Sequence, residues 1–328
     1  MKNIFFILCC LIFFPYNYLH ADNDVKNCTE QPQLTFDSCP QVKAFIEELL
    51  NKKPSVGYTR TQLLEHFSKV SFDPEPLSLM VKTGESKPWS SYIAQLLSPK
   101  KIVDGLAFYK KNQDILEKIS AKYGVSAPII VSTLGMETNY GAFSGRFKLL
   151  NTLSNLAFNY PKTIANYKER ELFFKEQLHA FFILAHRNII DISTTKGSYA
   201  GAVGIPQFMP KNILEYGVDD VGNTEKVDII NNVGHAAASV ANYYKNKGAW
   251  EQNGMVMATK EGLCRTPQGK HYAPTQSIVD PGTEYEQKWL TCNNFASIRK
   301  YNINNKYAMA VYLLAEEIRK VVEMPAKM

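Results

Sequence analysis

The chain has 328 residues, of which 45% are hydrophobic and 21% are charged, and this composition excludes a disordered, collagen-like or coiled-coil protein. Its 37 basic and 31 acidic residues give a net charge of +6 without a long basic run, so nucleic acid is not an expected partner. The length suits one large domain or two ordinary ones, with enough apolar residues for a core.

The first residues have the pattern of a secretory signal. Lys2 precedes an apolar run over residues 4–14, and Ala21 supplies a small residue at the end of the segment. The run is too short for a bilayer, which needs roughly 20 residues. We therefore predict a signal peptide over residues 1–21, a polar leader over residues 22–41, and export to the periplasm. The alternative is an uncleaved anchor or a buried strand.

Four cysteines follow the predicted signal peptide, and export together with an even number of cysteines indicates disulfides. Of the three possible pairings, the short-range one joins Cys28 to Cys39 and Cys264 to Cys292, and each bond would stabilise the fold by on the order of 3 kcal/mol. A zinc site is not expected, because the sequence has no CxxC pair and no Cys/His cluster. Reduced thiols are the alternative if the protein is not exported.

Helical periodicity begins at Val42 and continues to Gly124. The apolar positions that form this pattern are Phe45, Leu49, Leu50, Leu63, Leu64, Phe67 and the runs 92–97 and 102–119. Ser126 is then expected to cap a new helix that has Pro128 in its first turn. Residues 129–137 of that helix are mostly apolar, which predicts that the helix is buried.

Three more helices are predicted in the second half of the chain, over residues 165–187, 234–247 and 307–322. Residues 250–295 differ, because glycine, proline, threonine and tyrosine replace the helical pattern there, and we expect a small β-rich insert. The predicted fold is therefore α+β and mainly helical. Its predicted parts are a helical domain (42–249), the insert (250–295) and a C-terminal segment that completes the helical domain (296–328).

Glu137 is the most informative polar residue of the sequence. It ends the apolar helix, and the eight positions before it are uncharged. Burial raises the pKa of a carboxyl group, which suits a general acid, and glycosidases use such an acid to protonate the oxygen that leaves a sugar. The alternative is a glutamate that emerges at the helix end and pairs with a lysine or arginine.

Ser198 and Gln207 lie in a segment rich in small residues, 196–210. Small residues let a backbone approach a ligand closely, and the hydroxyl and amide groups could bond to sugar hydroxyls or an acetamido group. The segment is not a phosphate loop, because no Gly-Lys-Ser/Thr sequence follows. The alternative is a tight crossing of two helices, where small residues serve packing only.

Tyrosine and asparagine recur together near residues 159–161, 242–244 and 301–307. Such side chains could line a sugar groove, although buried core tyrosines are the ordinary alternative.

The acidic stretch 219–228 lacks the alternating ligands of a calcium loop. No HExxH pattern is present either. We therefore predict no metal and no cofactor.

In their order along the chain, these segments resemble the lytic murein transglycosylases of the B type, glycoside hydrolase family 103. The resemblance runs from about residue 43 to residue 320. The matching segments are 87–92, 123–125, 135–138, 156–161, 197–202, 207–210, 239–243, 294–295, 301–302 and 307–311. No single segment is specific, but their number and order favour the family over the packing alternatives.

The resemblance implies a lysozyme-like helical core that cleaves the β-1,4 bond between N-acetylmuramic acid and N-acetylglucosamine in peptidoglycan and forms a 1,6-anhydro sugar. It implies that Glu137 is the single acid and base. The positions that match the family's sugar groove are Tyr92, Ser198, Gln207, Tyr243, Tyr301, Asn302 and Tyr307. Lys162 stands where the family tends to have arginine. The lysine keeps the positive charge but lacks the two parallel N–H donors with which arginine binds a carboxylate.

The expected partners are peptidoglycan glycan strands, and the expected state is a monomer. A peripheral contact with the envelope membrane is left open.

Two other functions remain open. A muramidase that uses water needs a second carboxylate, about 5 Å or roughly 6.5–9.5 Å from the first, and Asp191 is the nearest candidate in the pattern. A wall-binding protein on an inactive enzyme scaffold needs no acid at all.

Overall fold

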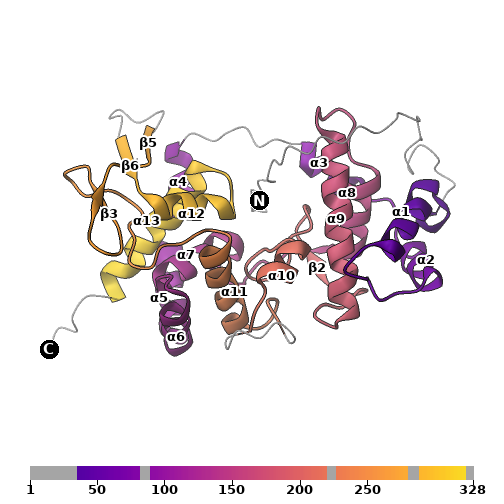
Figure 1. Ribbon diagram of the computed structural model, residues 1–328, viewed down its shortest axis with the longest axis horizontal. Coiled ribbons are helices and arrows are strands. Elements are labelled where there is room, and N and C mark those ends of the chain that lie inside the picture. Colours follow the sequence, from indigo (N-terminus) through magenta and orange to yellow (C-terminus); the bar gives the residue numbers. More distant parts are fainter. Residues whose placement is uncertain (1–34, 82–88, 220–226, 280–287, 323–328) are drawn as a thin grey trace. The chain divides into compact units, whose positions relative to one another are not determined.

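The structure is a computed structural model that describes residues 35–81, 89–219, 227–279 and 288–322. Within these residues helices predominate, and short antiparallel strand pairs accompany them (Figure 1). The helices are η2 (Phe36–Ser38), α1 (Pro40–Asn51), α2 (Arg60–Ser68), α3 (Pro74–Val81), α4 (Trp89–Leu96), α5 (Pro99–Lys111), α6 (Gln113–Tyr123), α7 (Ala127–Thr138), α8 (Leu149–Phe158), α9 (Tyr167–His186), α10 (Pro210–Tyr216), α11 (Val233–Asn246), α12 (Asn293–Tyr301) and α13 (Asn305–Val322). The strands are β1 (Phe147–Lys148), β2 (Lys196–Gly197), β3 (Cys264–Arg265), β4 (His271–Tyr272), β5 (Gln276–Val279) and β6 (Lys288–Thr291).

The predicted fold class, α+β and mainly helical, is confirmed. The apolar run 102–119 is helical, and it is divided between α5 and α6 at Asn112. The side-chain amide of Asn112 donates to the carbonyl of Phe108 at 2.8 Å, so an asparagine closes one helix where no glycine or proline marks the end. Gly124 ends α6 as predicted, with a left-handed φ of +72° that a side chain would disfavour.

The chain divides into two compact units, and each is described by itself. We call the first the Ser198 unit, and its described residues are 35–81 and 144–215. We call the second the Glu137 unit. Its described residues are 89–143, 216–219, 227–279 and 288–322.

The Ser198 unit is built around α8 and α9, which lie side by side (Figure 1). Helix α9 buries Phe174, Leu178 and Phe181 on the stripe that the sequence predicts. The ring of Phe158 on α8 meets that of Phe45 on α1 edge to face, with the centroids 5.5 Å apart. Each such buried side chain stabilises the fold by about 1.5–3 kcal/mol, so the aromatic core holds α1, α8 and α9 together.

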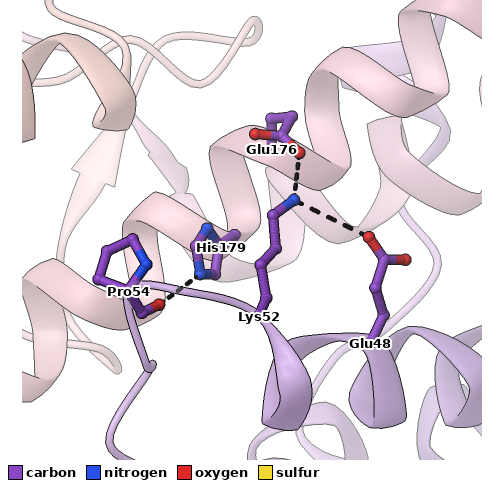
Figure 2. A network of polar contacts seen from close by, with 5 residues as sticks. All are labelled: Glu48, Lys52, Pro54, Glu176 and His179. Atoms are coloured by element: carbon purple, nitrogen blue, oxygen red, sulfur yellow. Dashed lines mark hydrogen bonds and ion pairs between the residues drawn. The ribbon is translucent and has the colours of Figure 1, made fainter.

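A polar network on the Ser198 unit joins the end of α1 to α9 (Figure 2). The ammonium of Lys52 forms an ion pair with Glu176 on α9 and lies 3.8 Å from the carboxylate of Glu48 on α1. One turn further along α9, Nε2 of His179 is 2.9 Å from the carbonyl oxygen of Pro54. Exposed ion pairs contribute little to stability, so this network mainly orients the connection that follows α1.

Helix α7 is the centre of the Glu137 unit. Eleven of its 12 residues are buried, which confirms the predicted burial, and it packs against α5, α6, α11 and α13. A buried hydroxyl needs a hydrogen-bond partner, and Ser132 donates to the carbonyl of Val311 on α13 at 2.5 Å. Ser126 is the N-cap residue of α7, as predicted, but its side chain makes no capping hydrogen bond.

The strands β3 to β6 all lie within the predicted β-rich insert. β3 pairs with β4 and β5 with β6, both antiparallel, with Gln276 opposite Thr291 in the second pair. Cys264 and Cys292 form the predicted disulfide, with a Cα–Cα distance of 5.7 Å. The insert is therefore tied at the residue that immediately precedes α12.

The predicted signal peptide and Cys28 lie outside the described residues, so the signal and the Cys28–Cys39 pair stay predictions. Cys39 itself is buried and disulfide-bonded. Among the described residues, no helix combines the length and the apolar character needed to cross a membrane.

Candidate active site

Glu137 lies in the last turn of α7 and is only 8% exposed. The helix ends directly after it, because Asn139 and Tyr140 both adopt a left-handed backbone with φ of +50° and +61°. Such conformations cost of order 1–3 kcal/mol and cluster at functional sites. The sharp ending holds the carboxyl at a fixed point in the unit.

The carboxyl of Glu137 accepts a hydrogen bond from the hydroxyl of Tyr307 on α13, and the two oxygens are 2.5 Å apart. Burial raises the pKa of Glu137 to about 7, while this hydrogen bond and the positive charge of Lys101 act in the opposite direction. Within the described residues Glu137 makes no ion pair, so the alternative of a carboxylate paired with a cation is wrong. A carboxyl with such a pKa can give and take a proton near neutral pH.

Three of the predicted tyrosines form a chain of ring contacts that begins at the partner of this carboxyl, Tyr307. Tyr307 stacks on Tyr301, with the ring centroids 6.4 Å apart and the planes at 11°, and Tyr301 meets Tyr243 edge to face at 5.0 Å. Tyr243 also donates to the carbonyl of Lys300 at 2.6 Å. The rings come from α11, α12 and α13, so residues distant in the sequence form one aromatic cluster beside Glu137.

Two further predicted residues lie in the same unit. Asn302 directly follows α12 and is 8% exposed, next to Tyr301 in the chain. Tyr92 is on α4, which packs against α13, and its ring stacks on Trp89 with the centroids 6.4 Å apart. Helices α4 and α12 both contact α13, the helix that provides Tyr307.

Ser198 lies in the other unit, in a series of turns after β2. Its hydroxyl oxygen accepts the backbone N–H of Ala202 at 3.0 Å, and its own N–H donates to the carbonyl of Ala202 at 2.8 Å. Gly201 permits the turn with a φ of +84°. The segment is a set of turns and short bridges, so the alternative of a helix crossing is wrong.

Gln207 belongs to the same turns, and its backbone is left-handed with φ of +51°. Its amide nitrogen donates to the carbonyls of Gly204 at 2.9 Å and Ser144 at 3.2 Å, while its amide oxygen is buried without a hydrogen-bond partner in the described structure. An unsatisfied buried acceptor is costly, so this oxygen is suited to a ligand that donates. Lys162 is exposed in the turn between α8 and α9.

Asp191, the candidate for a second carboxylate, also lies in the Ser198 unit. Its Oδ1 accepts hydrogen bonds from the N–H groups of Ser193 and Thr194 and from the hydroxyl of Ser193, at 2.7–2.8 Å. These bonds hold the pKa of Asp191 well below its usual range. The carboxylate therefore serves its own turn, as an acceptor for the backbone.

The acidic stretch 219–228 falls partly outside the described residues, because 220–226 are not among them. At its end, Oδ1 of Asp228 accepts the N–H groups of Ile230 at 3.0 Å and Asn231 at 2.9 Å. In the part of the chain that is described, His, Cys, Asp and Glu form no group of three or more that could hold a metal ion.

Sequence reasoning missed Lys101 and Tyr140, and it named Tyr244 only as part of the tyrosine-rich segment 242–244. Tyr244 is fully buried, and its hydroxyl lies 2.8 Å from that of Thr133, one turn before Glu137. Lys101 belongs to the buried stripe of α5, together with Gly105 and Tyr109 at intervals of four residues. Helical phase could have found Lys101, but the adjacent Lys100 looks identical in the sequence and is exposed.

A model of the family described as transglycosylase SLT domain matches residues 41–316. The membrane-bound lytic murein transglycosylase B of Escherichia coli (strain K12) is 30% identical over 316 residues, which cover 86% of this chain and 84% of that protein.

Two solved structures from Pseudomonas aeruginosa are also similar. The soluble lytic transglycosylase SltB1 has a TM-score of 0.74 and 30% identity, covering 86% of this chain and 99% of that one. SltB3 in complex with NAG-anhNAM-pentapeptide has a TM-score of 0.68 and 26% identity, covering 85% of this chain and 79% of that one.

The family match extends over most of both units, and the mostly helical architecture agrees with the lysozyme-like folds of these transglycosylases. The implied resemblance is thereby confirmed at the level of family and fold. The chain therefore belongs to the lytic murein transglycosylase B family and is an enzyme of that class.

Proposed function

We propose that this enzyme cleaves the β-1,4 bond between N-acetylmuramic acid and N-acetylglucosamine in peptidoglycan with Glu137 alone as acid and then base, and that it forms a 1,6-anhydro sugar. One observation carries the proposal: Glu137 is a buried carboxyl whose pKa is raised to about 7 and which accepts its hydrogen bond from a neutral phenol.

In the first step Glu137 gives its proton to the glycosidic oxygen, and the bond from that oxygen to the anomeric carbon breaks. The acetamido group of the muramic acid stabilises the cation that forms at the anomeric carbon. In the second step the ionised Glu137 removes the proton of the C6 hydroxyl, whose oxygen then bonds to the anomeric carbon. Attack within one sugar has a high effective concentration, so no water is consumed.

A single carboxylate is favoured over a pair by the surroundings of Glu137. The groups that shift its pKa are Tyr307 and Lys101, and no second carboxylate is among them in the described structure. Asp191 is engaged by the N–H groups of its own turn. A hydrolytic enzyme of the usual kind would place a second carboxyl within about 10 Å of the first.

The sugar contacts are proposed within each unit. In the Glu137 unit the rings of Tyr92, Tyr243, Tyr301 and Tyr307 and the amide of Asn302 would contact the glycan. In the Ser198 unit the contacts would be the hydroxyl of Ser198, the amide oxygen of Gln207 and the ammonium of Lys162. Support comes from the unsatisfied amide oxygen of Gln207 and from the relative SltB3, which was solved with NAG-anhNAM-pentapeptide.

We further propose that the enzyme acts in the periplasm as a monomer without a cofactor. The apolar run at the start of the sequence and the Cys264–Cys292 disulfide both favour export.

Digestion of purified sacculi tests the mechanism, with the products analysed by mass. The wild-type enzyme should release muropeptides that end in the anhydro sugar, each lighter by one water than the product of hydrolysis. Glu137→Gln should abolish release. The matched control is Glu261→Gln, which removes an exposed carboxyl of the same unit and should keep full activity.

Three results would contradict the proposal. Ordinary reducing ends would assign the enzyme to the muramidases, which use water. Full activity of Glu137→Gln would exclude Glu137 as the acid, and absence of any release by the wild-type protein would favour a wall-binding function.

A further inference from the structure

Lys101 is a buried cation that the proposed mechanism does not use. It lies at the start of α5 and is 6% exposed. Lysine is almost never fully buried unless it is paired. Yet within the described residues its ammonium makes neither an ion pair nor a hydrogen bond, and burial lowers its pKa to about 8. The carboxyl groups of Glu137 and Asp104 act against this lowering without forming an ion pair with the ammonium in the described structure, and this placement calls for a functional reason.

The backbone of Lys101 is tied to the segment that follows Glu137. The hydroxyl of Tyr140 donates to the carbonyl of Lys101 at 2.9 Å. The Tyr140 ring fits only because Gly105 on α5 and Gly135 on α7 have no side chain, since a Cβ at Gly105 would lie 2.5 Å from the Tyr140 hydroxyl and one at Gly135 would lie 2.6 Å from its ring. Tyr140 thus fixes α5 against α7, and with it the position of Lys101 relative to Glu137.

The charges of Lys101 and Glu137 act on each other. The positive charge lowers the pKa of Glu137, and the negative charge raises that of Lys101. Other ionisable groups lie nearby: Asp104 on α5 acts on Lys101 and on Tyr140 after α7, Tyr244 on α11 and Tyr307 on α13 interact with Glu137, and Tyr301 on α12 interacts with Tyr307. None of these is a cation, so Lys101 is the positive charge that acts on the carboxyl within the described structure.

We propose that Lys101 is a positioning residue for catalysis, whose positive charge offsets the effect of burial on Glu137 and keeps this carboxyl able both to donate and to accept a proton. The inference rests on the proposed role of Glu137. Without the cation, the carboxyl would hold its proton more tightly, donate it less readily and reach the ionised state needed for the second step only at higher pH.

The first experiment measures kcat/KM against pH with soluble glycan strands. Lys101→Met removes the charge and keeps an unbranched side chain of similar length, so the fold should tolerate it. The alkaline limb, where Glu137 loses its proton, should move to higher pH by at least about 0.5 unit. The matched control is Lys111→Met, which removes an exposed lysine from the last turn of the same helix and should leave the limb in place.

The second experiment needs no activity and no change at Lys101. With lysine labelled at Cε, the titration of the Lys101 ammonium is followed by NMR in the wild type and in Glu137→Gln. Because coupling between two sites is reciprocal, loss of the Glu137 charge should lower the pKa of Lys101. This measurement also serves if Lys101→Met fails to fold.

The outcomes separate the two proposals. An unmoved limb in Lys101→Met, or an unmoved Lys101 titration in Glu137→Gln, would overturn the role of Lys101 even if Glu137 is the acid. An active Glu137→Gln enzyme would instead overturn the proposed function, and the positioning role would fall with it even where the NMR titration shows that the two charges are coupled.

Discussion

Replacing Tyr307 by phenylalanine removes the hydrogen bond to Glu137 and leaves the stacked ring in place. A hydrogen bond to a charged group contributes about 1.5–3 kcal/mol, and one pKa unit corresponds to about 1.36 kcal/mol. The bond favours the ionised carboxylate, so its loss should raise the pKa of Glu137 by about 1–2 units. The acid form then persists to higher pH, and the alkaline limb of kcat/KM should move upward by the same amount.

The assay is the release of anhydro muropeptides from sacculi between about pH 5 and about pH 10. Tyr312→Phe is the matched control, because it removes a phenol from the same helix that makes no hydrogen bond to Glu137. An alkaline limb that stays in place in Tyr307→Phe while the rate changes would refute the reasoning, since Tyr307 would then contact substrate without acting on the carboxyl.

Two further predictions concern stability. Replacing Cys264 and Cys292 by serine opens a loop with a sequence separation of 28 residues, and the chain-entropy relation gives a loss of about 3.5 kcal/mol in the free energy of unfolding. Urea unfolding measures this loss. A free energy of unfolding that stays the same as that of the wild type would contradict the prediction. Thr133→Val keeps the shape of the side chain but leaves the buried hydroxyl of Tyr244 without its partner at 2.8 Å. The variant should therefore lose about 1–3 kcal/mol of unfolding free energy in the same measurement. Unchanged stability would mean that another group forms a hydrogen bond with the phenol.

The helices that the sequence predicts well are those with a continuous apolar pattern. α9 repeats its apolar residues at helical spacing over 20 residues, and α7 is apolar nearly all round, so pattern alone locates both helices. The boundary between α5 and α6 could not be predicted in this way, because it depends on one hydrogen bond from Asn112. Short helices such as α3 and α10 have too few turns for periodicity to be distinguished from chance.

Only part of the candidate site could be predicted from the sequence. Glu137 stands out because a carboxyl is rare in an apolar helix, and the neighbours in the sequence are enough to show that the helix is apolar. The bond from Tyr307 and the field of Lys101 depend on residues 170 and 36 positions away, which only the packing of α13 and α5 against α7 brings close. Local pattern could name the acid but could not show what sets its pKa.

Burial of Glu137 should make the folded enzyme less stable at pH values at which the carboxyl is ionised. The pH dependence has the opposite sign to that of an acidic residue whose pKa is lowered by folding. The folded-state pKa, about 7, lies above the ordinary value of 4.5, so the folded state binds more protons between these values and stability falls as pH rises through them. The difference corresponds to about 3 kcal/mol at pH values above about 7 and to none below about 4.5.

Glu137→Gln, which is neutral at every pH, should therefore be more stable than the wild type in urea unfolding at about pH 8 and equal to it at about pH 4. The gain would be the stability that the active enzyme gives up to keep a proton donor in an apolar setting, as is common for catalytic groups. A gain of the same size at both pH values would show that improved packing, and not relief of a buried charge, stabilises the variant. In that case the carboxyl would be better solvated than its 8% exposure indicates, and its role as an acid near neutral pH would lose its physical basis.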